Sequence, residues 1–80
     1  MKIQIRKHDI DVGNRGCTTS CPVARAIKRV TDKPVDVIGT YAKIGDKKVD
    51  LPYVVMKFIH EYDFEFNVQP LEFELEIEDV

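Results

Sequence analysis

The segment from residue 15 to residue 22 carries the residue types best suited to binding chemistry. It is rich in hydroxyl side chains and ends at Pro22, which predicts a helix start because a first helical residue needs no N–H donor. The free amides and the dipole of a first helical turn attract anions. The sequence therefore predicts a phosphate-binding site made by Arg15, Thr18, Thr19, Ser20, Arg25, Lys28 and Arg29. An ordinary helix cap, with Ser20 or Cys21 as acceptor, is the competing interpretation.

Two cysteines and two histidines form a weaker candidate, a metal site. Zinc is often held by two cysteines and two histidines, and the chain contains one such set: His8, Cys17, Cys21 and His60. Only a C-x3-C spacing connects any two of them, so we expect free thiols and no cofactor. Cys21 lies near Arg25 at the helix start, which predicts a lowered pKa for its thiol. Because no spacing fixes a catalytic base, we expect a protein that is not an enzyme.

The end of the chain alternates strictly between apolar and acidic residues. This alternation predicts a strand over 71–78 whose inner face carries Leu71, Phe73, Leu75 and Ile77. Its outer face would carry Glu72, Glu74, Glu76 and Glu78. Such a face is either solvated and salt-paired or complementary to a basic protein partner, and both interpretations are open. The same charges repel phosphates, which disfavours nucleic-acid binding through the sheet.

Periodicity and turn residues place these side chains on a small set of elements. The helix at Pro22 is supported by an apolar stripe at Val23, Ala26, Ile27 and Val30. The predicted elements are a strand over 1–6, a helical turn over 8–13 capped by Asp9, a helix over 22–31, a strand over 35–44, a hairpin turn at 45–48, a return strand over 49–51, a helix that begins near Pro52 and a strand over 71–78.

The order of the longer elements is β-α-β-β-α-β, within a single domain over 1–80. This order predicts an α+β fold with one four-stranded antiparallel sheet and two helices on one face, ferredoxin-like or related. If the first and last strands pair, Lys2 and Arg6 lie beside the glutamates of the last strand and neutralise part of their charge.

Composition and charge exclude several classes of protein. The 80 residues are 44% hydrophobic and 32% charged, which is typical of a globular domain and not of a disordered chain. No apolar run reaches the length of a membrane helix, and the alternating start is not a secretory signal, so we expect a cytoplasmic protein with reduced thiols. The net charge of −2 excludes bulk binding to polyanions. Residues 1–34 are nevertheless net basic and residues 35–80 net acidic.

One pattern resembles a known group of proteins. The pattern Asp9-Ile10-x-x-Gly13…Cys21-Pro22-Val23-Ala24-x-Ala26-Ile27-x-Arg29 resembles small uncharacterised proteins encoded by phages and prophages, and Leu51-Pro52, Tyr62-Asp63 and Pro70 extend it over most of the chain. The Cys-Pro-Val-Ala helix start is its distinctive part. The resemblance implies a setting, the cytoplasm of a host cell, and no mechanism.

These observations lead to three functional hypotheses. The first is a non-enzymatic phage or prophage binding protein, an anti-defence factor that sequesters a phosphorylated small molecule, such as a nucleotide signal, at the start of the helix over 22–31. The second is a protein–protein inhibitor that binds a host defence complex through its acidic strand face. The third is a small zinc-stabilised structural module. A closed pocket in so short a chain would need a homodimer or higher oligomer, for which unpaired sheet edges offer a route.

Overall fold

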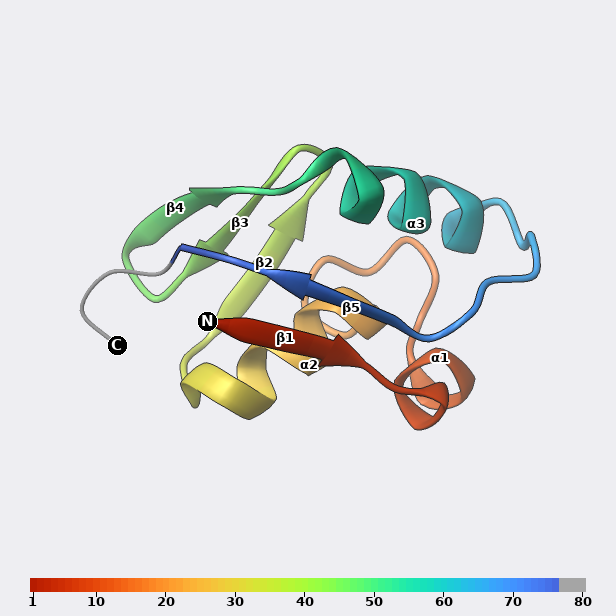
Figure 1. Cartoon of the computed structure of the whole chain (residues 1–80), viewed down its shortest axis with the longest axis horizontal. Coiled ribbons are helices and arrows are strands. Elements are labelled where there is room, and N and C mark those ends of the chain that lie inside the picture. The colour runs from red at the N-terminus through yellow and green to blue at the C-terminus, as the bar shows by residue number, and fades with distance from the viewer. Residues whose placement is uncertain (77–80) are drawn as a thin grey trace.

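The structure is a computed structural model of the whole chain, and it describes residues 1–76 (Figure 1). Over these residues the fold is α+β, with three helices and two antiparallel sheets. In chain order the elements are β1 (Lys2–Ile5), α1 (Lys7–Val12), α2 (Pro22–Thr31), β2 (Val35–Ile38), β3 (Tyr41–Ile44), β4 (Lys47–Asp50), α3 (Tyr53–Asp63) and β5 (Leu71–Glu74).

The expected single sheet of four strands is wrong, although the α+β class is confirmed. β1 pairs with β5 in one sheet, with Ile3 opposite Phe73, which is the pairing of first and last strands that the sequence analysis considered as a condition. β2, β3 and β4 form a second sheet in that order. The predicted strand over 35–44 is divided because the chain reverses at Gly39, whose φ of 53° is open to glycine and strained for other residues. β2, β3 and β4 thus form a separate meander, and among the described residues β1 pairs only with β5.

The helix over 22–31 has the predicted bounds but not the complete predicted stripe. Val23, Ala26 and Ile27 are buried, whereas Val30 is 41% exposed. The Cys21 thiol is the N-cap and accepts from the amide of Ala24 at 3.4 Å. The cap that competed with an anion site in the sequence is therefore present.

A single hydrophobic cluster joins both sheets to α2 and α3. Its largest buried side chain is Tyr62 of α3, whose hydroxyl lies 3.0 Å from the Ile10 carbonyl and 2.8 Å from the Gly13 carbonyl. At Gly13 a Cβ atom would lie 2.6 Å from the Asp9 carbonyl oxygen and 2.9 Å from Cδ of Pro22. Glycine is therefore required where α1 ends against the start of α2.

The predicted faces of the last strand are confirmed within the described residues. Phe73 and Leu75 are buried, Leu71 is half-buried, and the glutamates between them are exposed. Ile77 and Glu78 lie outside the residues that the structure describes. β5 ends at Glu74 and is shorter than the predicted strand.

Candidate functional site

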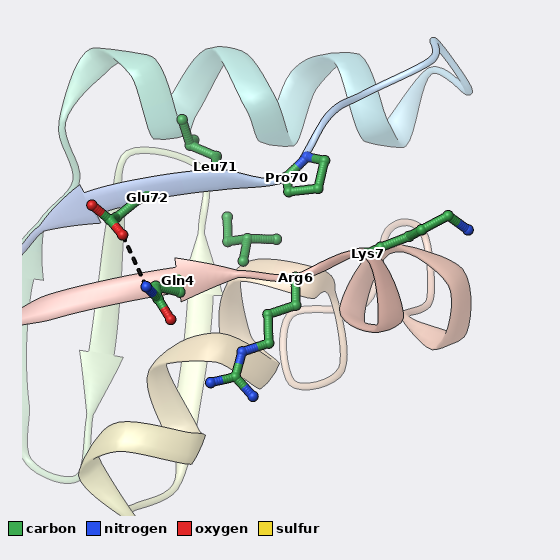
Figure 2. A pocket seen from close by; sticks show the side chains of 7 residues that line it. Gln4, Arg6, Lys7, Pro70, Leu71 and Glu72 are labelled. Carbon is green, nitrogen blue, oxygen red and sulfur yellow. Dashed lines mark hydrogen bonds between the residues drawn. The ribbon is translucent and has the colours of Figure 1, made fainter.

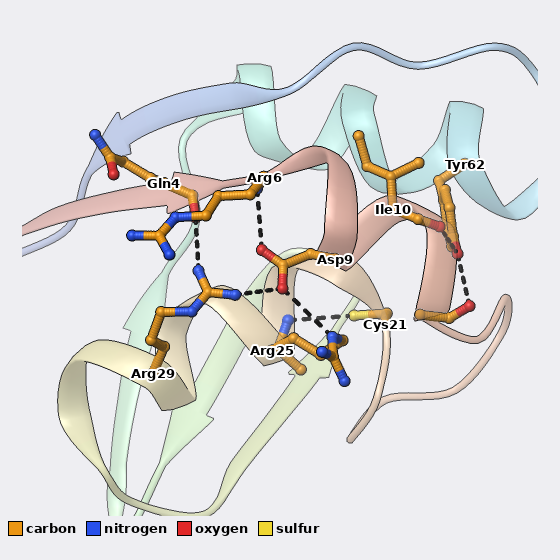
Figure 3. Close-up of polar contacts among 10 residues, drawn as sticks. Gln4, Arg6, Asp9, Ile10, Cys21, Arg25, Arg29 and Tyr62 are labelled. Carbon is orange, nitrogen blue, oxygen red and sulfur yellow. Dashed lines mark hydrogen bonds and ion pairs between the residues drawn. The ribbon is translucent and has the colours of Figure 1, made fainter.

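A buried carboxylate organises the basic side chains of α2. Asp9, in the first turn of α1, is 0% exposed, and its Oδ2 accepts from the backbone N–H of Arg6 at 2.9 Å. Its Oδ1 accepts a hydrogen bond from Arg25 Nε at 3.4 Å and a second one from Arg29 Nη2 (Figure 3). α1 and α2 are thus joined by one acid that neutralises two guanidinium groups in part.

The protonation of Asp9 follows from these contacts. Burial by itself raises the pKa of the carboxyl, since it disfavours the charged form. The Arg6 amide and the guanidinium groups of Arg29 and Arg25 act in the opposite direction, and the net result is a pKa below the ordinary value. Asp9 is therefore ionised at neutral pH and holds its two arginines throughout that range.

The outward parts of these arginines contribute to a basic surface. The side chains of Arg25 and Arg29 remain about one-third exposed, at 34% and 33%. With Lys28 and Asp32 they line an open hollow of about 340 Å³ on α2. Figures 2 and 3 both draw the exposed Arg6 side chain directed toward α2. We name Arg6, Arg25, Lys28 and Arg29 the basic surface.

The other predicted anion-binding residues lie elsewhere, in the loop before α2. Arg15 Nε donates to the Tyr62 carbonyl at 3.0 Å, and its guanidinium lies 4.8 Å from the centre of the Tyr62 ring. The Thr18 hydroxyl donates to Asp36 Oδ1 at 3.0 Å, and the Thr18 carbonyl accepts from Val37 at 2.8 Å. The two Thr18 bonds hold the loop along the edge of β2, and the Arg15 contacts hold it against α3.

The remaining two loop hydroxyls surround Cys17. Ser20 Oγ donates to the Cys17 sulfur at 3.0 Å, and Thr19 Oγ1 lies 3.5 Å from the same sulfur. The Ser20 hydroxyl is the largest cause of a pKa of Cys17 lowered to about 7, followed by the Thr19 hydroxyl and by hydrogen bonds from the backbone of Thr19 and Ser20.

The predicted low pKa of Cys21 is wrong. Burial raises the pKa of this thiol, because the side chain lies within the core beneath the loop and a thiolate there would lose its hydration. Of the two cysteines, Cys17 is therefore the one that forms a thiolate near neutral pH.

A hollow of about 200 Å³ lies between this loop, β2 and α3. Its lining includes both thiols, and Asp63 is its one charged lining residue; the full set is Gly16, Cys17, Thr18, Cys21, Val37, Ile38, Gly39, Ile59 and Asp63. Asp63 Oδ1 accepts from the backbone N–H of Gly16 at 3.0 Å. A phosphate at the predicted position would thus face a carboxylate and not an arginine.

The four potential zinc ligands do not gather around one point. Among residues 1–76, no group of three or more His, Cys, Asp or Glu side chains is placed to hold a metal ion. Cys17 and Cys21 line the same hollow, whereas the His60 ring lies 4.7 Å from that of Phe64. The structure therefore places no zinc cluster within the described part of the chain.

The acidic face of β5 is partly neutralised by β1. Glu72 accepts from Gln4 Nε2 at 2.9 Å (Figure 2). It also pairs with Lys2 Nζ at 3.5 Å, and these contacts lower the pKa of Glu72, with the Gln4 hydrogen bond as the largest cause. Glu74 pairs with the amino terminus at 3.3 Å. Glu76 is exposed, and Glu78 lies outside the described residues. Part of the charge asymmetry of the sequence is thus used within the fold.

Comparisons of the chain with protein-family models, with curated proteins and with solved structures found no match. In the described residues, no helix combines the length and the apolar character needed to cross a bilayer. Functional conclusions therefore depend on the chain's own geometry.

Two features of the candidate site differ from what the sequence predicts. The sequence places Asp9 at a helix cap and Arg6 on the outer face of a strand, and it predicts neither the pairing of Asp9 with two arginines nor the position of Arg6 beside α2. Their signal in the sequence is weak: Arg25 and Arg29 are four residues apart and lie on one side of a helix, but nothing local shows that a distant aspartate pairs with both.

Proposed function

We propose that this chain is a small, non-enzymatic binding protein of phage or prophage origin that holds a phosphorylated small molecule on its basic surface. The observation that carries this proposal is the fixation of Arg25 and Arg29 by the buried carboxylate of Asp9. An arginine that is already held in place loses less conformational entropy when it binds a ligand. The resemblance to phage proteins supports an anti-defence role in the host cytoplasm.

The donors that remain on the basic surface suit a phosphate. Arg25 contacts Asp9 through Nε, so neither of its Nη groups donates to that carboxylate. Arg29 uses Nη1 for the Gln4 carbonyl at 3.2 Å and Nη2 for Asp9. We therefore assign direct phosphate contact to Arg25, Lys28 and Arg6, and a positioning role to Arg29.

Three of the seven residues predicted from the sequence belong to this surface, namely Arg25, Lys28 and Arg29. The remaining four, Arg15, Thr18, Thr19 and Ser20, have partners within the fold. The proposed site thus keeps the phosphorylated ligand of the first hypothesis and moves it from the helix start to the outer side of α2.

Isothermal titration against mono-, di- and cyclic nucleotides tests the proposal. A charge-assisted hydrogen bond contributes about 1.5–3 kcal/mol, so Arg25→Ala should weaken binding about 10- to 100-fold. Lys28→Ala and Arg6→Ala change exposed side chains and should weaken binding without unfolding the chain. Lys7→Ala is the matched control, because Lys7 is exposed and pairs with Asp11. Binding of no nucleotide below about a millimolar would refute this function.

A second candidate function is the inhibition of a host protein complex through the acidic strand. The observation in its favour is that β5 is an edge strand whose glutamates are exposed on its outer face. Assays of phage infection with Glu72, Glu74 and Glu76 changed to Lys, compared with Lys28→Ala and Arg6→Ala, distinguish the two functions. Loss of activity in the first set alone would favour protein inhibition.

A further inference from the structure

The two sheets leave two strand edges open beside a single groove. Among residues 1–76, β5 is paired only with β1, and β4 only with β3, so each of these strands has one edge without a partner strand in the described part of the chain. Residues 48–52 and 74–76 line a hollow of about 440 Å³ between these edges. In Figure 1 the short blue segment that directly follows β5 passes beside β4 at this groove.

The hydrogen-bond pattern shows which backbone groups face the groove from β5. Met1 and Leu75 exchange both of their backbone hydrogen bonds, at 2.7 and 2.9 Å. Bonded and non-bonded pairs alternate along an antiparallel ladder. The N–H and C=O groups of Glu74 and Glu76 therefore point away from β1, and both residues line the groove.

The same reasoning applies to β4. The amide of Leu51 donates to the Thr40 carbonyl at 3.0 Å, which continues the β3–β4 ladder by one residue. By alternation, the backbone groups of Lys48 and Asp50 point away from β3, and these residues line the other side of the groove. Open ladder groups thus border the groove on both sides.

The charge of the groove is acidic. Asp50, Glu74 and Glu76 contribute carboxylates, and Lys48 is the one cation among the lining residues. The Lys48 ammonium group lies 4.6 Å from the centre of the Tyr41 ring, so this cation is drawn toward β3. A neutral or acidic peptide gains no charge complementarity from these carboxylates, whereas a basic peptide does. The basic peptide gains it along the same strand whose backbone groups can pair with the peptide.

We propose that an extended, basic segment of a partner protein adds to the β5 edge as a strand in this groove. The inference deepens the second candidate function and depends on it. A second copy of this chain is a poorer occupant, because antiparallel pairing of two β5 edges would place glutamates opposite glutamates. The backbone would supply affinity, and the carboxylates would select basic side chains.

The test uses the full chain and a short blocked peptide of alternating lysine and valine. We expect the peptide to shift the backbone amide resonances of Glu74, Glu76, Lys48 and Asp50 and to slow amide hydrogen exchange at Glu74 and Glu76. The same peptide N-methylated at alternate amides should bind at least about tenfold more weakly, as should a peptide with glutamate in place of lysine. Equal binding of all three peptides, or shifts confined to other surfaces, would overturn the proposal.

Two protein variants form a matched pair. Glu74→Pro removes an outward N–H within the groove and leaves the β1–β5 ladder complete, so it should abolish peptide binding. Lys2→Pro makes the same change on the outer edge of β1, where the Lys2 N–H points away from β5 and outside the groove, and it should leave binding intact. If the proline variants do not fold, Glu76→Lys replaces them as the test variant, and it should weaken peptide binding about tenfold. The oligomeric state of the free chain is measured by sedimentation. If the chain sediments as a dimer and the peptide does not dissociate it, the proposal is overturned, because a second copy then occupies the groove.

Failure of this inference is distinguishable from failure of the function on which it depends. If changing the glutamates to Lys abolishes activity in infected cells but the peptide does not bind, the acidic face acts without strand addition. If neither effect is found, both the inhibitor function and the strand groove are wrong.

Discussion

At the level of single residues, the buried carboxylate of Asp9 links two helices of the fold. It connects the first turn of α1 to two arginines of α2, Arg25 and Arg29. The fixation of those arginines is what makes the basic surface a candidate site. Stability and binding are therefore linked at this residue.

Asp9→Asn should destabilise the fold. The amide keeps the size of the side chain and an oxygen for the Arg6 N–H, but it removes the charge that compensates Arg25 and Arg29. Breaking a buried ion pair costs about 3–5 kcal/mol, and the partial exposure of both arginines places the expected loss at the lower end. The urea midpoint measures it, with Asp11→Asn as the exposed control that should change stability by under about 1 kcal/mol.

The pH dependence of stability has a definite sign at Asp9. Its pKa is lowered in the folded state, so the unfolded chain binds the proton more readily. The stabilisation is complete above the unfolded pKa of about 3.9 and is lost as the pH falls through the lower folded pKa. Urea unfolding of the wild type and of Asp9→Asn should therefore converge below about pH 4. A difference that stays constant down to acidic pH would contradict this assignment.

The two thiols should differ sharply in reactivity. Alkylation requires the thiolate, and the pKa of Cys17 is about 7 whereas that of Cys21 is raised. The rate of reaction with iodoacetamide should therefore rise with a midpoint near pH 7 in the wild type and be nearly lost in Cys17→Ser. Ser20→Ala removes the larger of the two hydroxyl contacts and should move the midpoint upward. An unchanged midpoint in Ser20→Ala would show that the hydroxyl does not hold the thiolate.

At the level of elements, β5 contributes apolar side chains to the core and carboxylates to the surface. Phe73 is buried opposite Ile3, so Phe73→Ala should cost about 3–5 kcal/mol. Glu74 is exposed and pairs only with the amino terminus among the described residues, so Glu74→Gln should change stability by well under about 1 kcal/mol. Equal shifts of the urea midpoint in the two variants would refute the assigned faces.

The sequence was informative where one local signal determines an element. Pro22 and the stripe that follows it determine α2, and the alternation after Pro70 determines the faces of β5. The division at Gly39 also had a signal: the buried positions are odd before it, at Val35 and Val37, and even after it, at Ala42 and Ile44. A change of phase across a glycine predicts a turn. Residues 35–44 are rich in β-branched and aromatic residues on both sides of Gly39, so composition alone indicates one continuous strand.

The candidate site was less predictable because its contacts are distant in sequence. Asp9 meets Arg25 and Arg29 only after α1 folds against α2, and the close approach at Gly13 fixes that geometry. Helical spacing placed the arginines together but could not supply their counter-ion. Likewise, the hydroxyls of the loop suggested a phosphate site, whereas the fold gives Thr18 to Asp36 and Ser20 to Cys17.

At the level of the whole molecule, the uneven charge of the chain becomes a spatial pattern. The basic first part forms β1, α1 and α2, which pack together, and the acidic last strand then pairs with β1. The ion pairs of Lys2 with Glu72 and of Met1 with Glu74 join the two ends of the chain. The hollow lined by Arg25, Lys28 and Arg29 and the groove between β4 and β5 are separate on this frame and have no lining residue in common.

The single core predicts that the molecule unfolds as one unit. Side chains of both sheets and of α2 and α3 belong to one cluster, so neither sheet has a core of its own. Far-ultraviolet circular dichroism reports the helices and sheets together, while near-ultraviolet dichroism reports the packing of the three tyrosines, of which Tyr62 is the buried one, since the chain has no tryptophan. The two signals should give one urea midpoint, and Tyr53→Phe, which changes an exposed ring, should leave it unmoved. An earlier loss of the near-ultraviolet signal would mean that α3 separates from α1 and the loop before the sheets unfold, and the fold would then consist of two cooperative units.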